Sequence, residues 1–522
     1  MSEVRQAAKS VLIIIIFSLG SKLLGLAREI LVAAKFGSGV ETDAYFVAIT
    51  AVMLITSLAG TSINTTMIPI LSEIEAKEGK TGKKKHTNNF INIMLVISLI
   101  IVVVGVTVAP VIIRILASGF RGEQFELAVL LTRIGFPVVF FSNTLFIIRG
   151  YLQTESYFAD TAASNIPYNL VFIVFLLFFS SKYGISGLMI TSIIAVASQI
   201  TFQIPGIKKT NFRYELFFDI GDKYLRKMLY LVPPVILGVA INDLNTIVDR
   251  TIASNLISGS ISALDYASKL NGMMMDVFVA AITTVIFPLL SKESSYDNYD
   301  EMKRFMGYGV NVILLITIPA TVGLIILSKP IVQVVFERGA FDATATVMTS
   351  KALLFYSIGL TAIALNSLLT RVFYSLQDTK TPMFYGAISV MSNVVLNLIL
   401  VRYMAHSGLA LATSIAITIA TILMFIKLKK RIGSMGTYGY IKCVLKSGFA
   451  SAIMGAIVYI IYNGLNKLLG NDSLSNLILL MTSISVGVVV YIIICYLIGV
   501  NEVKVFFDKV KQRIANYTKK TC

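Results

Sequence analysis

The sequence contains little of what metal sites, disulfide-rich domains and soluble globular proteins are built from. It has no tryptophan, two histidines and three cysteines. Cys443, Cys495 and Cys522 form no CxxC pair, and His86 and His406 stand far apart, which argues against a disulfide framework, a zinc site or an iron–sulfur site. Only 14% of the 522 residues are charged, whereas roughly a quarter are charged in an ordinary soluble domain.

What the chain has instead is apolar sequence in long runs. Hydrophobic residues make up 56% of it, and its mean hydropathy is +0.80. The runs reach the ~20 residues that a helix needs to cross a bilayer, and they lack the alternation of a membrane barrel. We therefore predict an all-α integral membrane protein with fourteen transmembrane helices, near residues 11–36, 42–72, 88–118, 125–150, 160–181, 184–206, 228–254, 262–290, 305–328, 348–374, 380–402, 407–427, 445–466 and 475–499.

The basic residues indicate how the chain crosses the membrane. The net charge is +17, which in a membrane protein is typical of cytoplasmic loops and gives no reason to expect a nucleic-acid partner. If the first helix enters from the cytoplasm, the basic segments 77–85, 208–227, 427–446 and 504–520 all lie inside. We predict that both termini are cytoplasmic and that the apolar N-terminal segment is an uncleaved first span.

A spacing that occurs twice divides the chain into two halves. Four features recur at an offset of 222 residues: Arg28 and Arg250, Gly37-Ser38 and Gly259-Ser260, Asp43 and Asp265, and Arg149 and Arg371. Both copies enter the membrane in the same sense, which predicts two six-helix lobes related by a parallel repeat. The predicted organisation is an N-lobe at 1–206, a cytoplasmic linker at 207–227, a C-lobe at 228–427, an added helix pair at 428–500 and a tail at 501–522.

Charged residues inside the apolar runs are the candidates for a binding site. A charge at membrane depth is costly unless it faces a wet cavity or a partner. Lys22 and Arg28 lie in the first predicted helix, and Lys269 lies in the eighth. One interpretation is a cationic cavity between the lobes, suited to an anionic head group such as a pyrophosphate. Lys22 and Lys269 favour it because neither has an evident repeat equivalent.

The other interpretation of these charges is structural. Arg28 would pair with Asp43, and Arg250 with Asp265, so that each pair joins consecutive helices. The duplicated spacing favours this interpretation for the arginine–aspartate pairs. Lys269 follows Asp265 by four residues, a separation that also suits a local ion pair on one helix.

A second group of polar residues offers oxygen atoms within apolar helices. Asn393 and Asn397 are four residues apart, Thr413 lies on the next helix, and Asp249 is embedded in the seventh. Together they offer the oxygen ligands that Na⁺ requires. Buried asparagines also join helices by hydrogen bonding, so both a sodium site and interhelical glue are open interpretations.

Four motifs carry a resemblance to a known family: SKLLGLAREILVAAKFGSGVETDAYFVA at 21–48, GSISALDYASKL at 259–270, FERGAFDATAT at 336–346 and RVFYSLQDTKTP at 371–382. In this order they resemble the MurJ (MviN) lipid II flippases of the multidrug/oligosaccharidyl-lipid/polysaccharide exporter superfamily. The resemblance covers essentially the whole chain, including fourteen predicted spans where drug-exporting relatives have twelve.

The resemblance implies a non-enzymatic, two-lobed protein in the bacterial cytoplasmic membrane. Such flippases move lipid II, the undecaprenyl-pyrophosphate-linked peptidoglycan precursor, from the inner to the outer leaflet by alternating access. Its partners would be lipid II, membrane lipids and cell-wall synthesis proteins, with coupling to Na⁺ or H⁺ and no cofactor. The family's cationic positions map onto Lys22, Arg28 and Lys269, and supporting roles fall to Glu29, Asp43, Arg250, Asp265 and Arg371.

One position departs from the family pattern. Thr56 stands where the family frequently has an arginine on the second helix, and this keeps open a paralogous flippase for another lipid-linked glycan, such as a teichoic-acid or capsule precursor. A cation-coupled drug exporter and a membrane scaffold for cell-wall enzymes are further alternatives. An enzyme is disfavoured, because no nucleophile–base pair, phosphate-binding loop or HExxH motif occurs.

Overall fold

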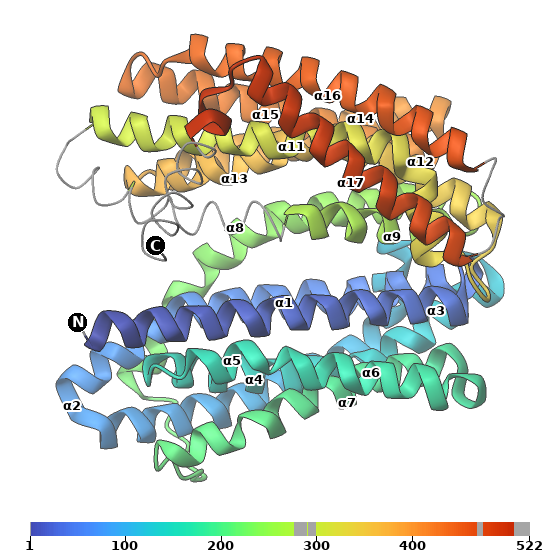
Figure 1. Cartoon of the computed structure of the whole chain (residues 1–522). Helices are drawn as coiled ribbons and strands as arrows, with labels where there is room; N and C mark the ends of the chain where they lie inside the picture. The colour runs from blue at the N-terminus through green and yellow to red at the C-terminus, as the bar shows by residue number, and fades with distance from the viewer. Residues whose placement is uncertain (1, 276–289, 291–298, 467–472, 506–522) are drawn as a thin grey trace, which may run out of the picture. The chain divides into compact units, whose positions relative to one another are not determined.

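The computed structural model describes residues 2–275, 290, 299–466 and 473–505. Within these ranges every regular element is a helix (Figure 1), which confirms the all-α prediction. The helices are α1 (Ser2–Phe36), α2 (Val40–Leu116), α3 (Gly122–Gly135), α4 (Pro137–Thr154), α5 (Phe158–Ala163), α6 (Asn165–Phe178), α7 (Ser180–Lys209), α8 (Lys223–Ala253), α9 (Ser260–Met274), α11 (Tyr299–Phe336), α12 (Ala343–Ile358), α13 (Leu360–Ser375), α14 (Lys380–Met404), α15 (His406–Ile432), α16 (Thr437–Asn466) and α17 (Ser473–Leu497).

Among the described residues, nine helical segments are long and apolar enough to span a membrane, and two of these segments are the consecutive helices α3–α4 and α5–α6. The number is ten if the bent pair α12 and α13 forms one span. The long helix α2 covers two predicted spans, and Gly79 between them has a non-helical backbone with φ +70°. The light-blue ribbon doubles back there (Figure 1), and apolar residues from both halves share one core. The chain is thus a multi-pass membrane protein, and the count of fourteen spans stays a prediction.

The chain divides into two compact units. The first contains Met1–Ser262 with Arg338–Asp342, and the second contains Ala263–Glu337 with Ala343–Cys522, each as far as it is described. Helix α8 packs against α2 and so belongs to the first unit, although its sequence position lies in the predicted C-lobe. The lobe boundaries that the repeat suggests stay predictions.

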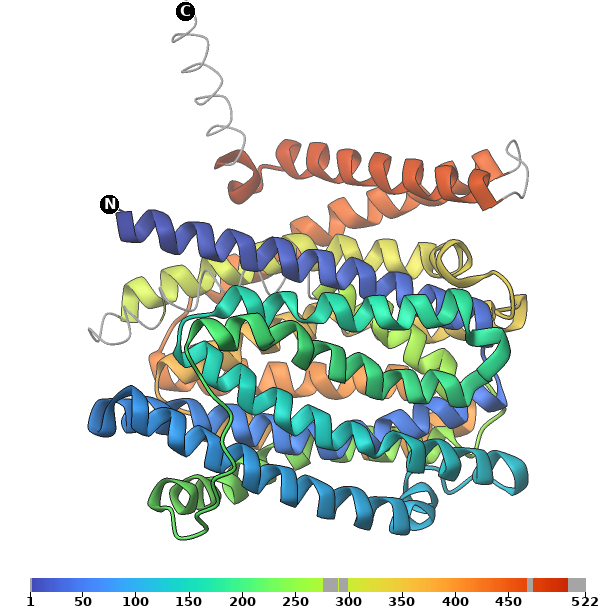
Figure 2. The ribbon, with the colours of Figure 1, turned by 90° about the horizontal axis from the view of Figure 1, so that it is seen from below.

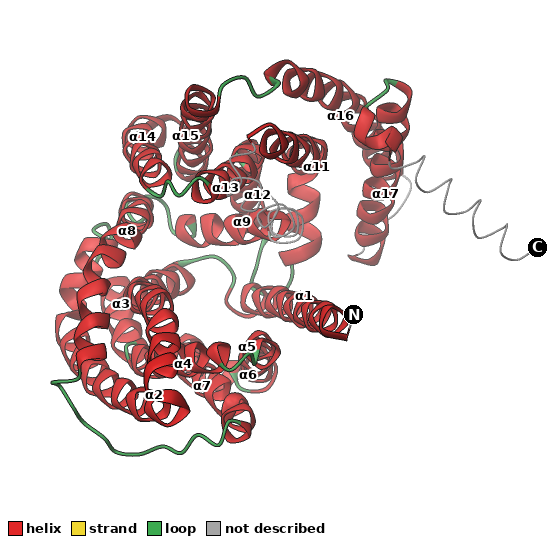
Figure 3. Cartoon of the chain, turned by 90° about the vertical axis from the view of Figure 1, so that its left-hand side faces the viewer, coloured by secondary structure: helices red, strands yellow, loops and turns green. Residues whose placement is uncertain are grey.

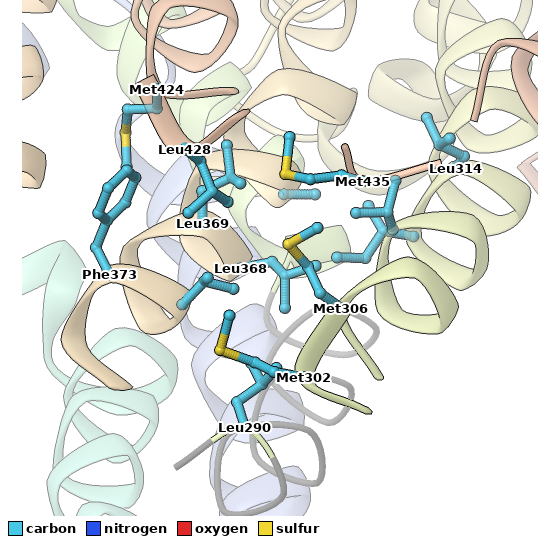
Figure 4. Packing of buried hydrophobic residues seen from close by; sticks show 14 of the residues in the cluster. Leu290, Met302, Met306, Leu314, Leu368, Leu369, Phe373, Met424, Leu428 and Met435 are labelled. Atoms are coloured by element: carbon cyan, nitrogen blue, oxygen red, sulfur yellow. The ribbon is translucent and has the colours of Figure 1, made fainter. Parts of the chain in front are cut away.

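In the first unit, α1 lies beside α5 and α6 (Figure 3), while α7 packs against α4 and α6 (Figure 2). Buried apolar residues on α2 and α4, among them Met67, Phe90 and Tyr151, form a core with the start of α8. In the second unit, α11, α13 and α15 share a core that includes Phe373 and Met424 (Figure 4). Tyr151 and Phe373 each lie two residues after an arginine of the repeat, so each repeated arginine is followed by an aromatic core residue.

The segment between α7 and α8 is held along the second half of α2 by three buried asparagines. Asn88 donates to the carbonyl of Arg213 at 3.0 Å, and Asn89 exchanges hydrogen bonds with the backbone of Asp219 at 2.9 and 2.8 Å. Asn92 donates to the carbonyl of Glu215 at 2.9 Å. Because an extended segment has no internal hydrogen bonds, these side chains satisfy backbone groups that secondary structure would otherwise satisfy.

The junction between α1 and α2 requires glycine. Gly37 has φ +66°, a conformation that costs a residue with a Cβ atom. A Cβ there would lie 2.3 Å from the carbonyl oxygen of Ala340, and one on Gly339 would lie 2.2 Å from that of Ala34. Ala340 also donates its N–H to Ala34 at 2.8 Å. The predicted loop motif at 336–346 thus supplies residues that close the end of α1 in the first unit.

Candidate functional site

The first candidate site residue, Arg28, is held in place on α1 by an acid and two aromatic rings. Its Nη2 donates to Oε1 of Glu29 at 2.6 Å, and Nε donates to the same oxygen at 3.2 Å. The guanidinium carbon lies 5.4 Å from the ring centre of Tyr168 and 5.3 Å from that of Phe172, both on α6. Cation–π contacts and the adjacent carboxylate therefore fix its orientation. Lys22 lies six residues earlier on α1 and is half-buried.

Asp43, near the start of α2, is 2% exposed and accepts three hydrogen bonds. Its oxygens accept from the N–H of Gly259 at 2.7 Å, the N–H of Ser262 at 2.8 Å and the Ser262 hydroxyl at 2.5 Å. Ser38 adds a bond to the carbonyl of Gly259 at 3.1 Å. Both repeated glycine-serine turns therefore meet in the first unit.

These contacts overturn the predicted pairing of Arg28 with Asp43. Each group has nearer partners: Glu29 for the guanidinium, and the turn at 259–262 for the carboxylate. The fifteen-residue spacing between Arg28 and Asp43 places them on consecutive helices, but it does not decide their pairing. The carboxylate of Glu29, the next residue after Arg28, is a direct competitor for the guanidinium.

The second copy of the repeat makes different contacts. Arg250, near the end of α8, donates to the carbonyl of Ile261 at 3.3 Å in the first unit. In the second unit, Nζ of Lys269 lies 2.7 Å from Oδ2 of Asp265, one helical turn away on α9. The predicted local ion pair is confirmed. The predicted cationic cavity between lobes stays a prediction, because Lys269 and Arg28 belong to different units.

Three of the four predicted ion ligands come together in the second unit. Asn397 donates to Oδ1 of Asn393 at 2.7 Å on α14, and Asn393 donates to the hydroxyl of Thr413 on α15 at 3.1 Å. Both asparagines are buried. This chain of hydrogen bonds joins α14 to α15, as the glue interpretation expects. Asp249 lies on α8 in the first unit, so the complete sodium-ligand set stays a prediction.

Two further predicted positions are Thr56 on α2 and Arg371 on α13. Thr56, where the family frequently has arginine, donates its hydroxyl to the carbonyl of Val52 at 2.8 Å within α2. Arg371 is exposed on α13. Its repeat equivalent Arg149 donates to Ser164 and Asn165 where α5 meets α6.

Sequence reasoning missed a polar cluster where the Gly79 turn meets the start of α8. His86 has Nδ1 2.6 Å from Oδ2 of Asp222 and Nε2 2.9 Å from Oε2 of Glu78. Bonds from His86 and then Lys223 lower the pKa of Glu78 to about 2. Nearby, the amine of Lys83 is 1% exposed and lies 2.6 Å from Glu75. The signal in the sequence was His86, which lies between the basic residues 83–85 and the three asparagines of TNNFIN at 87–92. Together these polar residues could have indicated an ordered cluster in the predicted cytoplasmic turn.

Comparison with known proteins identifies the family. A family model described as "Lipid II flippase MurJ" matches residues 32–480. The chain belongs to the MurJ family. A probable lipid II flippase MurJ of Buchnera aphidicola is 29% identical over 87% of this chain and 89% of that protein, and one of Vibrio cholerae is 30% identical over 79% and 81%.

Solved structures agree with the MurJ assignment. A lipid II flippase MurJ in an inward closed conformation matches with TM-score 0.78 and 28% identity, over 94% of this chain and 100% of that one. An inward-facing multidrug resistance MATE transporter of the MOP superfamily matches with TM-score 0.67 at 14% identity, over 81% and 99%. The second likeness concerns the fold alone.

Proposed function

We propose that this chain moves lipid II from the inner to the outer leaflet of the bacterial cytoplasmic membrane. Membership of the MurJ family carries the proposal, since this family consists of transport proteins and lipid II is the substrate that its name states. The orientation of Arg28 supports it, because two aromatic rings hold this guanidinium in one position within an apolar helix, where charged residues mark substrate pathways.

In this proposal Lys22, Arg28 and Lys269 bind the pyrophosphate of the substrate. Arg28 contributes a planar fork that matches phosphate oxygens, and the rings of Tyr168 and Phe172 hold that fork in one plane. Glu29 neutralises the guanidinium while no substrate is bound. When a pyrophosphate arrives, its charge competes with the carboxylate for the same N–H groups, so binding and release remain reversible.

Asp43 has a supporting role in the same proposal. Its three hydrogen bonds, and the bond from Ala340 to Ala34, hold the α1–α2 junction against residues 259–262 and 338–342 in the first unit. Alternating access requires contacts that break and re-form many times. Hydrogen bonds to a buried carboxylate suit this need, because they fix one geometry and exchange readily with water once opened.

The membrane orientation and the driving force complete the proposal. Both termini lie in the cytoplasm, and the membrane potential acts on the cations of the site. Asn393, Asn397, Thr413 and Asp249 would supply amide, hydroxyl and carboxylate oxygens to a coupling Na⁺. The first three already form one hydrogen-bonded chain. A bound cation would therefore replace these hydrogen bonds with ligand contacts at residues that are already close together.

Depletion of the protein in its own cells tests the proposal. Lipid II should accumulate on the cytoplasmic face, and the wild-type chain should relieve this accumulation. The Lys22→Ala, Arg28→Ala and Lys269→Ala variants should insert normally yet fail to relieve it. Arg133→Ala is the matched control, since this exposed arginine of α3 bonds, within the described part of the chain, only to the backbone carbonyl of Val106. Unchanged sidedness of lipid II in depleted cells would contradict the proposal.

A flippase for another lipid-linked glycan is the second candidate. The observation that favours it is Thr56, whose hydroxyl bonds within its own helix and which brings no charge where the family frequently has arginine. Probing the sidedness of teichoic-acid and capsule precursors in the same depleted cells separates the two candidates.

A further inference from the structure

A second arginine of the first unit is held by polar side chains and has no acidic partner among the residues that the structure describes. Arg149, on α4, donates from Nη2 to the hydroxyl of Ser164 at 2.8 Å and to Oδ1 of Asn165 at 3.2 Å. Asn165 begins α6, and its Oδ1 also accepts from Nε2 of Gln199 on α7 at 3.0 Å. Arg149 of α4, Ser164 and Asn165 at the α5–α6 junction, and Gln199 of α7 therefore form one hydrogen-bonded cluster.

The charge of Arg149 is not compensated within the described chain. No carboxylate of the described residues forms an ion pair with it, and its Nε is buried without a hydrogen bond. Asp160 on α5 lies instead against Gly206 of α7. A guanidinium among apolar helices is costly unless a charge of opposite sign is near. Helix joining alone does not explain it, because glutamine would form the same bonds without a charge.

An unpartnered amide faces the same region. Gln203 is 0% exposed, and both its Oε1 and Nε2 are buried without hydrogen bonds among the described residues. It lies one helical turn after Gln199 and one turn before Gly206, whose nearest neighbours include Leu152 of α4 and Asp160 of α5. Gln203 thus faces α4 and α5, and it adds unused hydrogen-bonding capacity beside an uncompensated positive charge.

One face of α6 connects this cluster to Arg28. Asn165, Tyr168, Asn169 and Phe172 occupy positions i, i+3, i+4 and i+7, which share a face. Asn169 donates to the carbonyl of Ser21 on α1 at 3.1 Å, while Tyr168 and Phe172 contact Arg28. Seven residues of helix span about 10 Å. Arg149 and Arg28 therefore contact different levels of one face of α6.

The end of α4, taken with the predicted membrane orientation, indicates which of the two arginines a cytoplasmic substrate meets first. Glu155, directly after α4, pairs with Lys83 in the basic turn around Gly79, and this turn is the segment predicted to be cytoplasmic. Arg149 precedes the end of α4, which is next to this turn, by five residues. Arg28 lies toward the C-terminal end of α1, which is the end away from the predicted cytoplasmic N-terminus. With the predicted orientation, Arg149 is the more cytoplasmic arginine.

We propose that Arg149, with Ser164, Asn165 and Gln199, forms a second oxyanion site that receives a phosphate group of the lipid-linked substrate before Arg28 does. The inference rests on the proposed function for the identity of its substrate. Its chemistry does not, since a guanidinium, a hydroxyl and two amides bind any phosphate oxyanion. Transfer from one arginine to the next along α6 would carry the phosphate from the cytoplasmic end toward the middle of the unit.

Binding of inorganic pyrophosphate to the full-length chain in lipid nanodiscs tests the inference. Calorimetry should give two equivalents bound to the wild-type chain and one to Arg149→Gln or to Arg28→Gln. In Arg149→Gln, the affinity of the Arg149 site for pyrophosphate should fall at least about tenfold, as expected for the loss of a charge-assisted hydrogen bond. Arg149→Lys should keep part of that affinity, because it keeps the charge. Arg133→Gln should bind two equivalents.

Three outcomes would overturn the inference. Two equivalents bound by Arg149→Gln, together with a lower thermal midpoint, would make Arg149 a structural joint only. One equivalent bound by the wild-type chain would remove the second site. Competition by acetate but not by inorganic phosphate would assign the site to carboxylates. None of these measurements requires transport, so a chain that does not move lipid II would refute the proposed function and leave the stoichiometry to decide this inference.

Discussion

The two copies of the repeated segment, 28–43 and 250–265, have the same backbone conformation at their glycine turns but make different contacts. Gly37 and Gly259 both have positive φ, +66° and +89°, so each copy makes its turn in the same way. Asp43 is buried and accepts from three groups at 259–262, while Asp265 pairs with Lys269 one turn away on its own helix. Identical spacing has produced one interhelical joint and one local pair.

The residues beside the repeated positions account for the difference. Glu29 forms an ion pair with Arg28. Its equivalent in the second copy is Thr251, which has no charge and so cannot form an ion pair with Arg250. Lys269 takes Asp265, and its equivalent in the first copy is the buried Val47. A duplicated glycine preserves a backbone conformation, since nothing else fits it, whereas a duplicated charge keeps its partner only if the partner is duplicated as well.

Replacing each aspartate by asparagine should give the largest difference between the copies. Asp43→Asn puts an N–H donor where two backbone N–H groups and a hydroxyl now donate, so we expect a loss of about 2 kcal/mol in the free energy of unfolding. Asp265→Asn breaks a partly exposed pair and should cost less than about 1 kcal/mol. Thermal unfolding of the detergent-solubilised chains at neutral pH measures both. Equal losses would mean that the two carboxylates have equivalent structural roles.

Converting the first copy toward the second should change anion binding by a smaller amount. Glu29→Thr gives Arg28 the neighbour that Arg250 has and removes the carboxylate that competes with a phosphate. Affinity for inorganic pyrophosphate should rise about three- to tenfold, which corresponds to about 1 kcal/mol for one screened charge. Titration of the purified chain measures it, with Thr251→Ala as the control expected to leave affinity unchanged. Weaker binding in Glu29→Thr would show that the glutamate orients Arg28 rather than competing with its ligand.

The comparison also shows what the sequence can and cannot predict. The all-helical membrane fold followed from continuous apolar runs, and the Asn393–Thr413 contact followed from a helical spacing of four and an adjacent helix. The partner of Arg28 did not follow, because a pairing across a turn depends on side-chain direction, which periodicity leaves open. Neither did the contacts of Arg149, since Ser164, Asn165 and Gln199 are ordinary polar residues until the fold brings them together.

A further comparison concerns two carboxylates outside the membrane spans that cap helices in similar ways. Asp222 accepts from the N–H of Tyr224 at the start of α8, and Asp378 accepts from the N–H and hydroxyl of Thr381 at the start of α14. Burial opposes ionisation of both, yet bonds from His86 and Asn89 to Asp222, and from Thr381 and Arg431 to Asp378, hold each pKa below its ordinary value of 3.8.

Because each of these pKa values is lowered in the folded chain, each carboxylate stabilises the fold above pH 3.8 and loses that contribution as the pH falls through the lowered value. Asp378→Ala should therefore cost about 1 kcal/mol at pH 7, as loss of a helix cap does, and the difference from wild type should shrink on acidification below pH 4. Asp222→Ala should follow the same curve with a larger plateau, since Asp222 also holds Asn89 and the segment between α7 and α8. Thermal midpoints between pH 3 and 7 measure both curves, and a difference independent of pH would show that hydrogen bonding without ionisation explains the stabilisation.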